Sequence, residues 1–224
     1  MTSTSTASPL DPEQRHFRAV NLAAERGDRT LFEQLSFELA PGQLLQVTGR
    51  NGTGKTTLLR ILSGLSRPRD GQVFWGAEPI QSVDGGTGLC LAYLGHANAQ
   101  KDDLTALENL TLIGQLAGSA TTPTAALEIL ERIGLAGFDD IPIRFLSQGQ
   151  KRRVALARLL LQQRPLWILD EPYAALDVQV IDVLKHTIEQ HLAQGGMIII
   201  TTHQTVAIDG DCHTLHLGRP RTGG

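Results

Sequence analysis

The sequence has little of what a secreted, disulfide-bonded or membrane-spanning chain needs. It contains only 2 cysteines among 224 residues. Cys90 and Cys212 form neither a C-x-x-C nor a C-x-x-C-H motif, which favours a reducing compartment and argues against covalent haem attachment. No apolar run approaches the roughly 18 residues of a membrane span, because the longest candidate, around residues 159–169, is interrupted by glutamines, an arginine and a proline. If the protein works at a membrane, we expect another chain to provide the pore or anchor.

The sequence also shows no pattern typical of a targeting segment and no dominant charge. Met1–Pro12 is rich in Ser, Thr and Pro and has neither a basic start nor an apolar stretch, so we expect a disordered tail over residues 1–14 and no signal peptide. The net charge is −3, without a block of five like charges, which gives no electrostatic footprint for nucleic acid. With 41% hydrophobic residues, segment 15–220 is long and apolar enough for one domain with a buried core.

The first functional motif in the sequence is a phosphate-binding pattern, G-x-x-x-x-G-K-[ST], at residues 49–57. An apolar run of strand length precedes it and a helix-forming run follows it. Its glycines let successive backbone N–H groups point inward, and the helix adds its positive end, so the pattern predicts a triphosphate in this loop. The predicted nucleotide-binding residues are Gly49, Arg50, Asn51, Gly52, Thr53, Gly54, Lys55, Thr56 and Thr57. Lys55 is assigned to the β and γ phosphates, and the Thr56 hydroxyl to Mg²⁺.

A second candidate catalytic element is the apolar run 166–169, which ends in Asp170 and Glu171. Pro172 prevents the strand from continuing as a regular ladder, so the two acids are delivered at its end. Taken alone, such a pair is more often a solvated strand end. Because a phosphate loop is present, we assign Asp170 to Mg²⁺ and Glu171 to polarising the attacking water.

A third element is a helix that residues 151–160 predict from their recurring apolar positions. The Ser147 hydroxyl is suited to cap it, which makes its N-terminus a second anion site in the chain. The basic cluster at residues 151–153 is short, and we explain it as part of this helix and not as a surface for nucleic acid.

Together these segments resemble the ABC ATPases. Residues 146–150 look like the LSGGQ signature, residues 169–177 like the Walker B segment and D-loop, and His203 like the H-loop histidine. The resemblance implies an α/β P-loop NTPase fold with a mostly parallel core sheet, an antiparallel β subdomain and a helical subdomain inserted at about residues 97–150. In that subdomain, apolar residues at helical spacing, Leu127 among them, are expected to be core. A helix over 178–192 and a buried strand over 197–202 are expected to follow.

The resemblance also implies an ATPase that works as a head-to-tail homodimer. The signature of one subunit, Ser147, Gln148, Gly149 and Gln150, would close in trans over ATP held by the other. Glu171 would be the general base, Asp177 the D-loop acid, and His203 the residue that holds the γ-phosphate and the attacking water in register. Without the resemblance, a lone histidine after an apolar strand is usually a surface or capping residue.

The chain departs from the family pattern at three positions. His96 stands where most members have the Q-loop glutamine, and because imidazole prefers softer metals than Mg²⁺, we expect it to bind a metal-bound water. Arg26 lies where an aromatic residue usually stacks on adenine, and it is either a guanidinium that stacks instead or a solvated arginine. Gln148 replaces the first signature glycine.

Within the family, the chain is most similar to the branch that serves cytochrome c maturation, the haem exporter ATPases. Segments 104–110, 141–142, 154–159, 167–172 and 201–204 carry this similarity. It implies ATP and Mg²⁺ as cofactors and a peripheral position on the cytoplasmic face of a bacterial inner membrane. The implied partners are a membrane-spanning permease subunit and further haem-handling membrane subunits, with no nucleic acid.

Two other functions remain open at this point. One is an ABC ATPase subunit for another cargo, such as a drug or a lipid. The other is an ABC-type ATPase that acts on nucleic acid or ribosomes, which is disfavoured because twin cassettes and long coiled-coil insertions are absent. Cys212, His213 and His216 could be imagined as a haem or metal ligand set, but alternation in a terminal strand explains their spacing.

Overall fold

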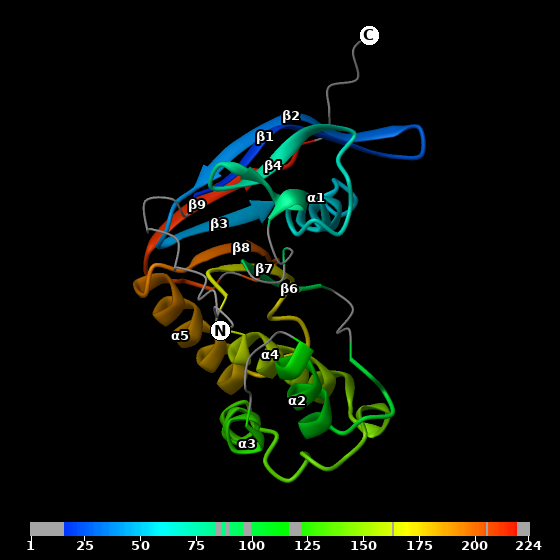
Figure 1. The fold of residues 1–224 in the computed structure, drawn as a ribbon, viewed down its shortest axis with the longest axis vertical. Coiled ribbons are helices and arrows are strands. Elements are labelled where there is room, and N and C mark those ends of the chain that lie inside the picture. Colours follow the sequence, from blue (N-terminus) through cyan, green and yellow to red (C-terminus); the bar gives the residue numbers. More distant parts are fainter. Residues whose placement is uncertain are drawn as a thin grey trace, which may run out of the picture.

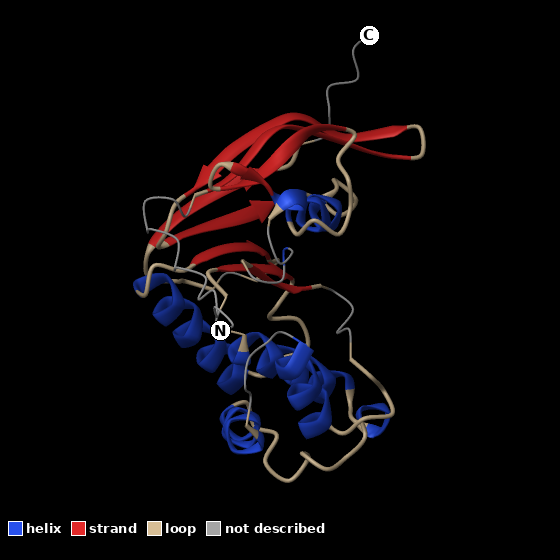
Figure 2. Ribbon diagram, in the orientation of Figure 1, coloured by secondary structure: helices blue, strands red, loops and turns tan. Residues whose placement is uncertain are grey.

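The computed structural model describes residues 16–83, 87, 90–95, 100–116, 122–162, 164–204 and 206–218. The tail expected over residues 1–14 and the Q-loop position His96 lie outside the described residues. Two sheets occupy one end of the molecule, and a group of helices occupies the other (Figures 1 and 2).

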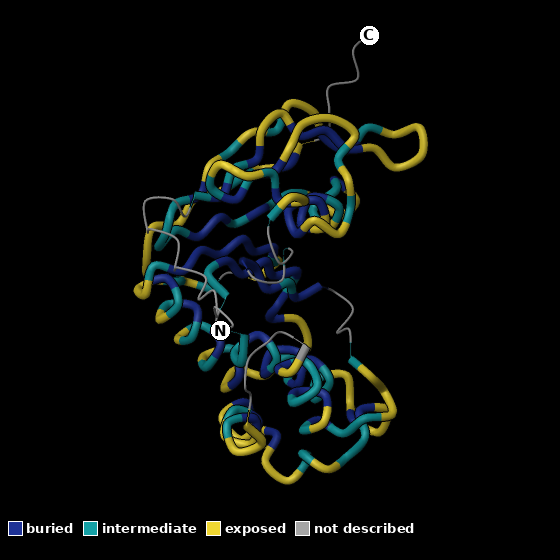
Figure 3. The backbone as a smooth tube through the Cα atoms, in the orientation of Figure 1, coloured by how far each residue is buried: buried dark blue, intermediate teal, exposed yellow. Residues whose placement is uncertain are grey.

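The core is a five-stranded parallel sheet in the order β6-β7-β8-β3-β9. Its strands are β3 (Gln43–Thr48), β6 (Leu91–Leu94), β7 (Leu166–Asp170), β8 (Met197–Thr201) and β9 (Asp211–His216). Every residue of β7 and β8 is buried, as their continuous apolar runs require of central parallel strands (Figure 3). Because parallel strands end at the same edge, this sheet brings the phosphate loop, Asp170 and the segment that carries His203 together.

A four-stranded antiparallel sheet, in the order β2-β1-β4-β5, covers the helix that follows the phosphate loop. Its strands are β1 (Phe17–Arg26), β2 (Arg29–Leu39), β4 (Asp70–Trp75) and β5 (Glu78–Pro79), and the short 3₁₀ helix η2 (Ile80–Ser82) follows β5. Helix α1 (Lys55–Leu62) buries Leu58, Leu59, Ile61 and Leu62 in a cluster shared with both sheets. This packing holds the phosphate loop between the β1–β2 hairpin and the core sheet.

Helices α2 (Ala106–Leu116), α3 (Pro123–Arg132) and α4 (Gln148–Leu161) share an apolar cluster of their own, and the 3₁₀ helix η4 (Ile143–Phe145) joins it. Leu127 was expected in this core, but it is 40% exposed, because α3 turns only one side toward its neighbours, with Ala126 and Leu130 buried. Helix α5 (Val178–Ala193) packs with α4 against the core sheet. Within the described part of the chain, we find no helix that is long and apolar enough to cross a bilayer.

The terminal strand β9 differs from the expected alternation. β9 lies at the edge of the sheet beside β3, and of its residues only Leu215 is partly buried while the others are exposed. His213 pairs with the Asp211 carboxylate at 3.1 Å, and the His216 Nδ1 lies 3.2 Å from the Thr48 hydroxyl. Among the described residues, no group of three or more His, Cys, Asp or Glu side chains is placed to hold a metal ion.

Candidate active site

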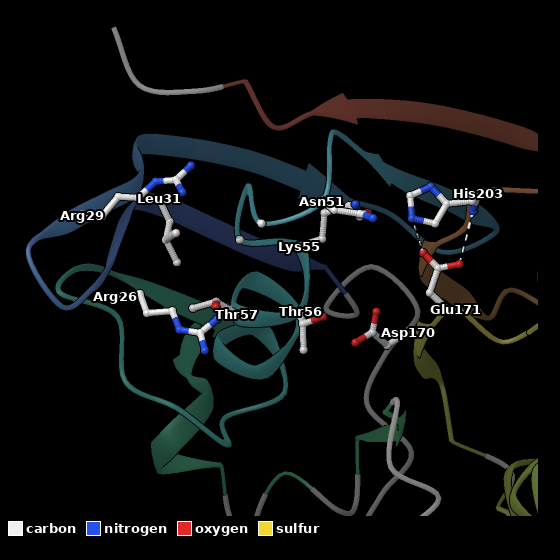
Figure 4. Close-up of a pocket in the computed structure, with 12 residues that line it drawn as sticks. Arg26, Arg29, Leu31, Asn51, Lys55, Thr56, Thr57, Asp170, Glu171 and His203 are labelled. Atoms are coloured by element: carbon white, nitrogen blue, oxygen red, sulfur yellow. Dashed lines mark hydrogen bonds and ion pairs between the residues drawn. The ribbon is translucent and has the colours of Figure 1, made fainter. Parts of the chain in front are cut away.

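A cavity of about 440 Å³ lies at the carboxyl edge of the core sheet, where the phosphate loop meets the ends of β7 and β8 (Figure 4). Its walls come from segments that are far apart in the sequence. The lining residues are Arg26, Arg29, Leu31, Asn51, Gly52, Gly54, Lys55, Thr56, Thr57, Asp170, Glu171 and His203.

The phosphate loop requires glycine at particular positions. Gly49 has φ +145°, and a Cβ there would lie 2.6 Å from the Leu217 carbonyl oxygen. Gly54 has φ +101°, and a Cβ there would come within 3.0 Å of the Leu31 side chain. Close approach of the loop to its neighbours thus excludes larger residues at both positions. Thr53 is buried, and its hydroxyl donates to the Arg50 carbonyl at 2.9 Å, which ties the loop to itself.

The positive groups of the loop point toward one place. The Lys55 ammonium donates to the Gly49 carbonyl at 2.7 Å and to the Arg50 carbonyl at 3.4 Å, which holds it over the loop. Helix α1 begins there with Gly54 as its N-cap, and no side chain caps the helix. Its first N–H groups and its positive dipole end are therefore available to an anion, as a polyphosphate requires.

Two carboxylates with different surroundings face this cationic loop. Asp170 is buried, and its Oδ1 accepts a 2.6 Å hydrogen bond from the Thr201 hydroxyl. Its buried Oδ2 has no hydrogen-bond partner among the described residues. Together with the Thr56 hydroxyl in the same cavity, this oxygen fits Mg²⁺, which prefers hard oxygen ligands.

Glu171 and His203 contact each other on one side of the cavity (Figure 4). The Glu171 Oε1 lies 3.3 Å from His203 Nε2, and its Oε2 accepts from the His203 backbone N–H at 3.3 Å. The backbone of Glu171 is left-handed, with φ +49°, which is rare and strained for a residue other than glycine. The Glu171 N–H is held by Thr201, through its carbonyl at 3.1 Å and its hydroxyl at 3.0 Å. A carboxylate held next to a histidine beside a polyphosphate site is suited to orient and deprotonate water.

The comparisons with known proteins point to the same machinery. Residues 32–174 match the ABC transporter family. The chain is 50% identical over 201 residues to the cytochrome c biogenesis ATP-binding export protein CcmA of Dechloromonas aromatica, an alignment that covers 89% of this chain and 98% of that protein. It is 50% identical over 190 residues to the Escherichia coli CcmA, with 85% and 90% covered.

Solved structures agree. The dimeric bacterial ABC transporter cassette MJ0796 superimposes with a TM-score of 0.77 at 25% identity and covers 90% of this chain and 95% of its own. A dimer of MJ0796 in a post-hydrolysis state, bound to ADP and Pi, gives a TM-score of 0.73 at 25% identity, with 84% and 88% covered. This chain belongs to the CcmA family of ABC ATPases. The expected α/β P-loop fold, with its parallel and antiparallel sheets, is confirmed.

The signature segment of this ABC ATPase lies outside the cavity of its own chain. Ser147 caps α4 by accepting from the Gln150 N–H at 3.2 Å, while the Gln150 side chain accepts from the Ser147 N–H at 2.8 Å. The expected cap is therefore confirmed and forms a reciprocal capping box. A Cβ at Gly149 would lie 3.1 Å from the Ala175 carbonyl, so the signature packs closely on the D-loop. Gln148, like the rest of the signature, does not line the cavity.

Asp177, the predicted D-loop acid, has two structural contacts in this ABC ATPase. Its Oδ1 accepts from the Val180 N–H at 3.0 Å and caps α5, and its Oδ2 forms an ion pair with Arg153. It does not reach the cavity of its own chain.

Sequence reasoning missed several residues of the site. Arg29 pairs with Arg26 across the β1–β2 hairpin, which places both residues in the lining of the cavity. The strand-turn-strand pattern around Gly27 is the sequence feature from which this pairing could have been predicted. The Thr201 hydroxyl donates to the Asp170 carboxylate and accepts from the Glu171 N–H. These contacts join neighbouring parallel strands, so no local sequence pattern indicates them.

Proposed function

We propose that this protein is the ATP-hydrolysing subunit of a bacterial inner-membrane ABC complex for c-type cytochrome biogenesis. The observation that carries the proposal is the cavity in which Lys55, Asp170, Glu171 and His203 converge, in a chain 50% identical to CcmA export proteins. Haem export and release of a haem carrier are both compatible with this assignment.

In this proposal, the phosphates of ATP bind the N–H groups of the phosphate loop and the Lys55 ammonium. Thr56 and Asp170 would hold Mg²⁺, which would neutralise charge on the β and γ phosphates. Glu171 accepts the proton of the attacking water. His203, which contacts the Glu171 carboxylate and lines the cavity, keeps that water and the γ-phosphate aligned.

The proposed working unit is a homodimer. The signature residues Ser147 and Gly149 lie outside their own cavity, and a capped α4 N-terminus without an acidic residue in its first turn is suited to meet the phosphates of the facing subunit. The D-loop, in which Ala175 lies close to Gly149 of the signature and Asp177 pairs with Arg153 of α4, would then lie at the dimer interface.

We assign the protein to the cytoplasmic face of the inner membrane, held there by a CcmB-like permease subunit. Further haem-handling membrane subunits would complete the complex. In this arrangement the chain supplies mechanical work from ATP and binds neither haem nor nucleic acid itself.

A test in cells separates this cargo from others. A strain that depends on Lys55→Ala should fail to accumulate holo c-type cytochromes while its b-type cytochromes stay normal, because only the former require the dedicated maturation route. Haem staining and difference spectra measure both, with a wild-type copy as the control. Normal c-type cytochromes in that strain, with the variant protein stably present, would favour an ABC transporter for another cargo.

The base of ATP is proposed to rest on the hairpin arginines. Among the described residues that line the cavity, none is Phe, Tyr or Trp, and Arg26 and Arg29 occupy the rim beside Leu31 (Figure 4). A guanidinium plane can stack on adenine, so Arg26→Ala should raise the Kd for ATP about threefold to tenfold, whereas Arg26→Tyr should keep it near that of the wild type.

Titration with a fluorescent ATP analogue measures this difference. Arg67→Ala removes an exposed arginine outside the cavity and serves as the matched control. Equal Kd values for Arg26→Ala and wild type would make Arg26 a solvated arginine.

A further inference from the structure

Arg152 is the one member of the basic cluster 151–153 that is buried, with 5% of its surface exposed. It lies one turn after the signature, on the side of α4 that faces the core sheet. A buried cation is costly unless it is paired and hydrogen-bonded. Burial lowers the pKa of the guanidinium, and the nearby Asp170 and Glu171 carboxylates oppose that shift. An arginine stays charged in such a place.

The partners of Arg152 lie at the ends of two neighbouring parallel strands. Its Nη1 donates to the Gly95 carbonyl, one residue beyond β6, at 2.8 Å. Its Nη2 donates to the carbonyls of Asp170 at 2.8 Å and of Glu171 at 2.7 Å. The planar Arg152 guanidinium thus connects α4, which begins in the signature, to the carboxyl ends of both β6 and β7.

Arg152 contacts Glu171 at its backbone carbonyl, and the backbone of Glu171 has a strained conformation. The left-handed backbone at Glu171 persists only if its surroundings hold it. Thr201 accepts from the Glu171 N–H, and the Glu171 carbonyl accepts from Arg152 Nη2 and from the Ala174 N–H. The direction of the Glu171 side chain toward His203 therefore depends on a residue of α4.

We propose that Arg152 is a positioning residue that couples the signature helix to the general base, so that displacement of α4 changes the placement of Glu171. This inference rests on the proposed function for the role of Glu171, but the hydrogen bonds that carry it do not. In the working dimer, docking of the signature on the nucleotide of the other subunit would set Glu171 of its own chain through Arg152.

Arg152→Lys tests the coupling, because a lysine keeps the charge but cannot present a planar fork to both strand ends. We expect kcat to fall about tenfold or more, while the KM for ATP stays within about twofold, since loss of a charge-assisted hydrogen bond on the base side affects chemistry and not phosphate binding. Lys151→Gln, which removes the neighbouring cation of the same helix, is the control, and it should leave both constants unchanged.

A second measurement does not depend on activity. Hydrogen exchange of the nucleotide-free protein should be about tenfold faster at the Glu171 amide in Arg152→Lys than in wild type or Lys151→Gln, because the peptide that joins Asp170 to Glu171 loses the hydrogen bond from Arg152 to its carbonyl. Wild-type exchange at Glu171 in Arg152→Lys would overturn the inference, as would faster exchange spread evenly over the whole chain. The wild type could also lack ATPase activity while exchange is faster only at Glu171 in Arg152→Lys. That result would refute the proposed function and support the positioning role.

Discussion

Lys55→Ala is expected to weaken ATP binding by about a hundredfold or more. The Lys55 ammonium is held over the phosphate loop by the Gly49 and Arg50 carbonyls, so in the proposed role it would meet the β and γ phosphates without having to be reordered. Each charge-assisted hydrogen bond to a phosphate contributes about 1.5–3 kcal/mol, and removal of the lysine takes these bonds away together with the one lysine charge among the described residues that line the cavity.

Isothermal titration of purified protein with ATP measures this effect. Lys185→Ala is the control, because it removes a lysine of α5 that pairs with Glu189 and does not line the cavity. Equal affinity of wild type and Lys55→Ala for ATP would rule out the phosphate-loop assignment. Because the proposed binding energy comes from charge, the wild-type Kd should also rise with added salt.

Glu171→Gln is expected to keep ATP binding and to lose turnover, by a factor of about 10²–10⁴, which is the usual contribution of a general base. Glutamine has nearly the same shape, and its amide oxygen can still accept from the His203 N–H, so the cavity should be preserved. What it lacks is a carboxylate that can take a proton. With hydrolysis blocked, ATP should hold two subunits together and trap the closed dimer.

Phosphate release and size-exclusion chromatography with ATP measure the two halves of this prediction. Glu128→Gln, an exposed residue of α3 away from the cavity, should behave like the wild type in both. Hydrolysis at the wild-type rate by Glu171→Gln would show that another group is the base. A variant that no longer binds ATP would instead place Glu171 in the support of the loop.

The elements around the site could be predicted because their patterns are local. The strand expected over residues 43–48 is β3, the apolar run 166–169 is β7 with Asp170 as its last residue, and the helix expected over 178–192 is α5, which extends to Ala193. A phosphate loop and a strand that ends in two acids each depend on neighbours in the sequence. The roles assigned to individual residues of these motifs stay predictions.

The errors came from positions whose surroundings are set by distant parts of the chain. The alternation expected of residues 211–216 is absent because side chains on both faces of β9, at the edge of the sheet, are exposed apart from the partly buried Leu215. Leu127 follows the helical apolar spacing, yet α3 leaves it exposed.

The sequence alone determined the nucleotide class, the fold family and the order of the motifs, since each depends on residue types at short spacing. Only the tertiary structure decided that Arg152, one of the three cations attributed to the helix after the signature, is buried against the carbonyls of Asp170 and Glu171. Its acceptors lie 57, 18 and 19 residues away along the chain. Those carbonyls meet one guanidinium only because β6 and β7 pair in parallel and α4 packs across their ends, a proximity that no local pattern encodes.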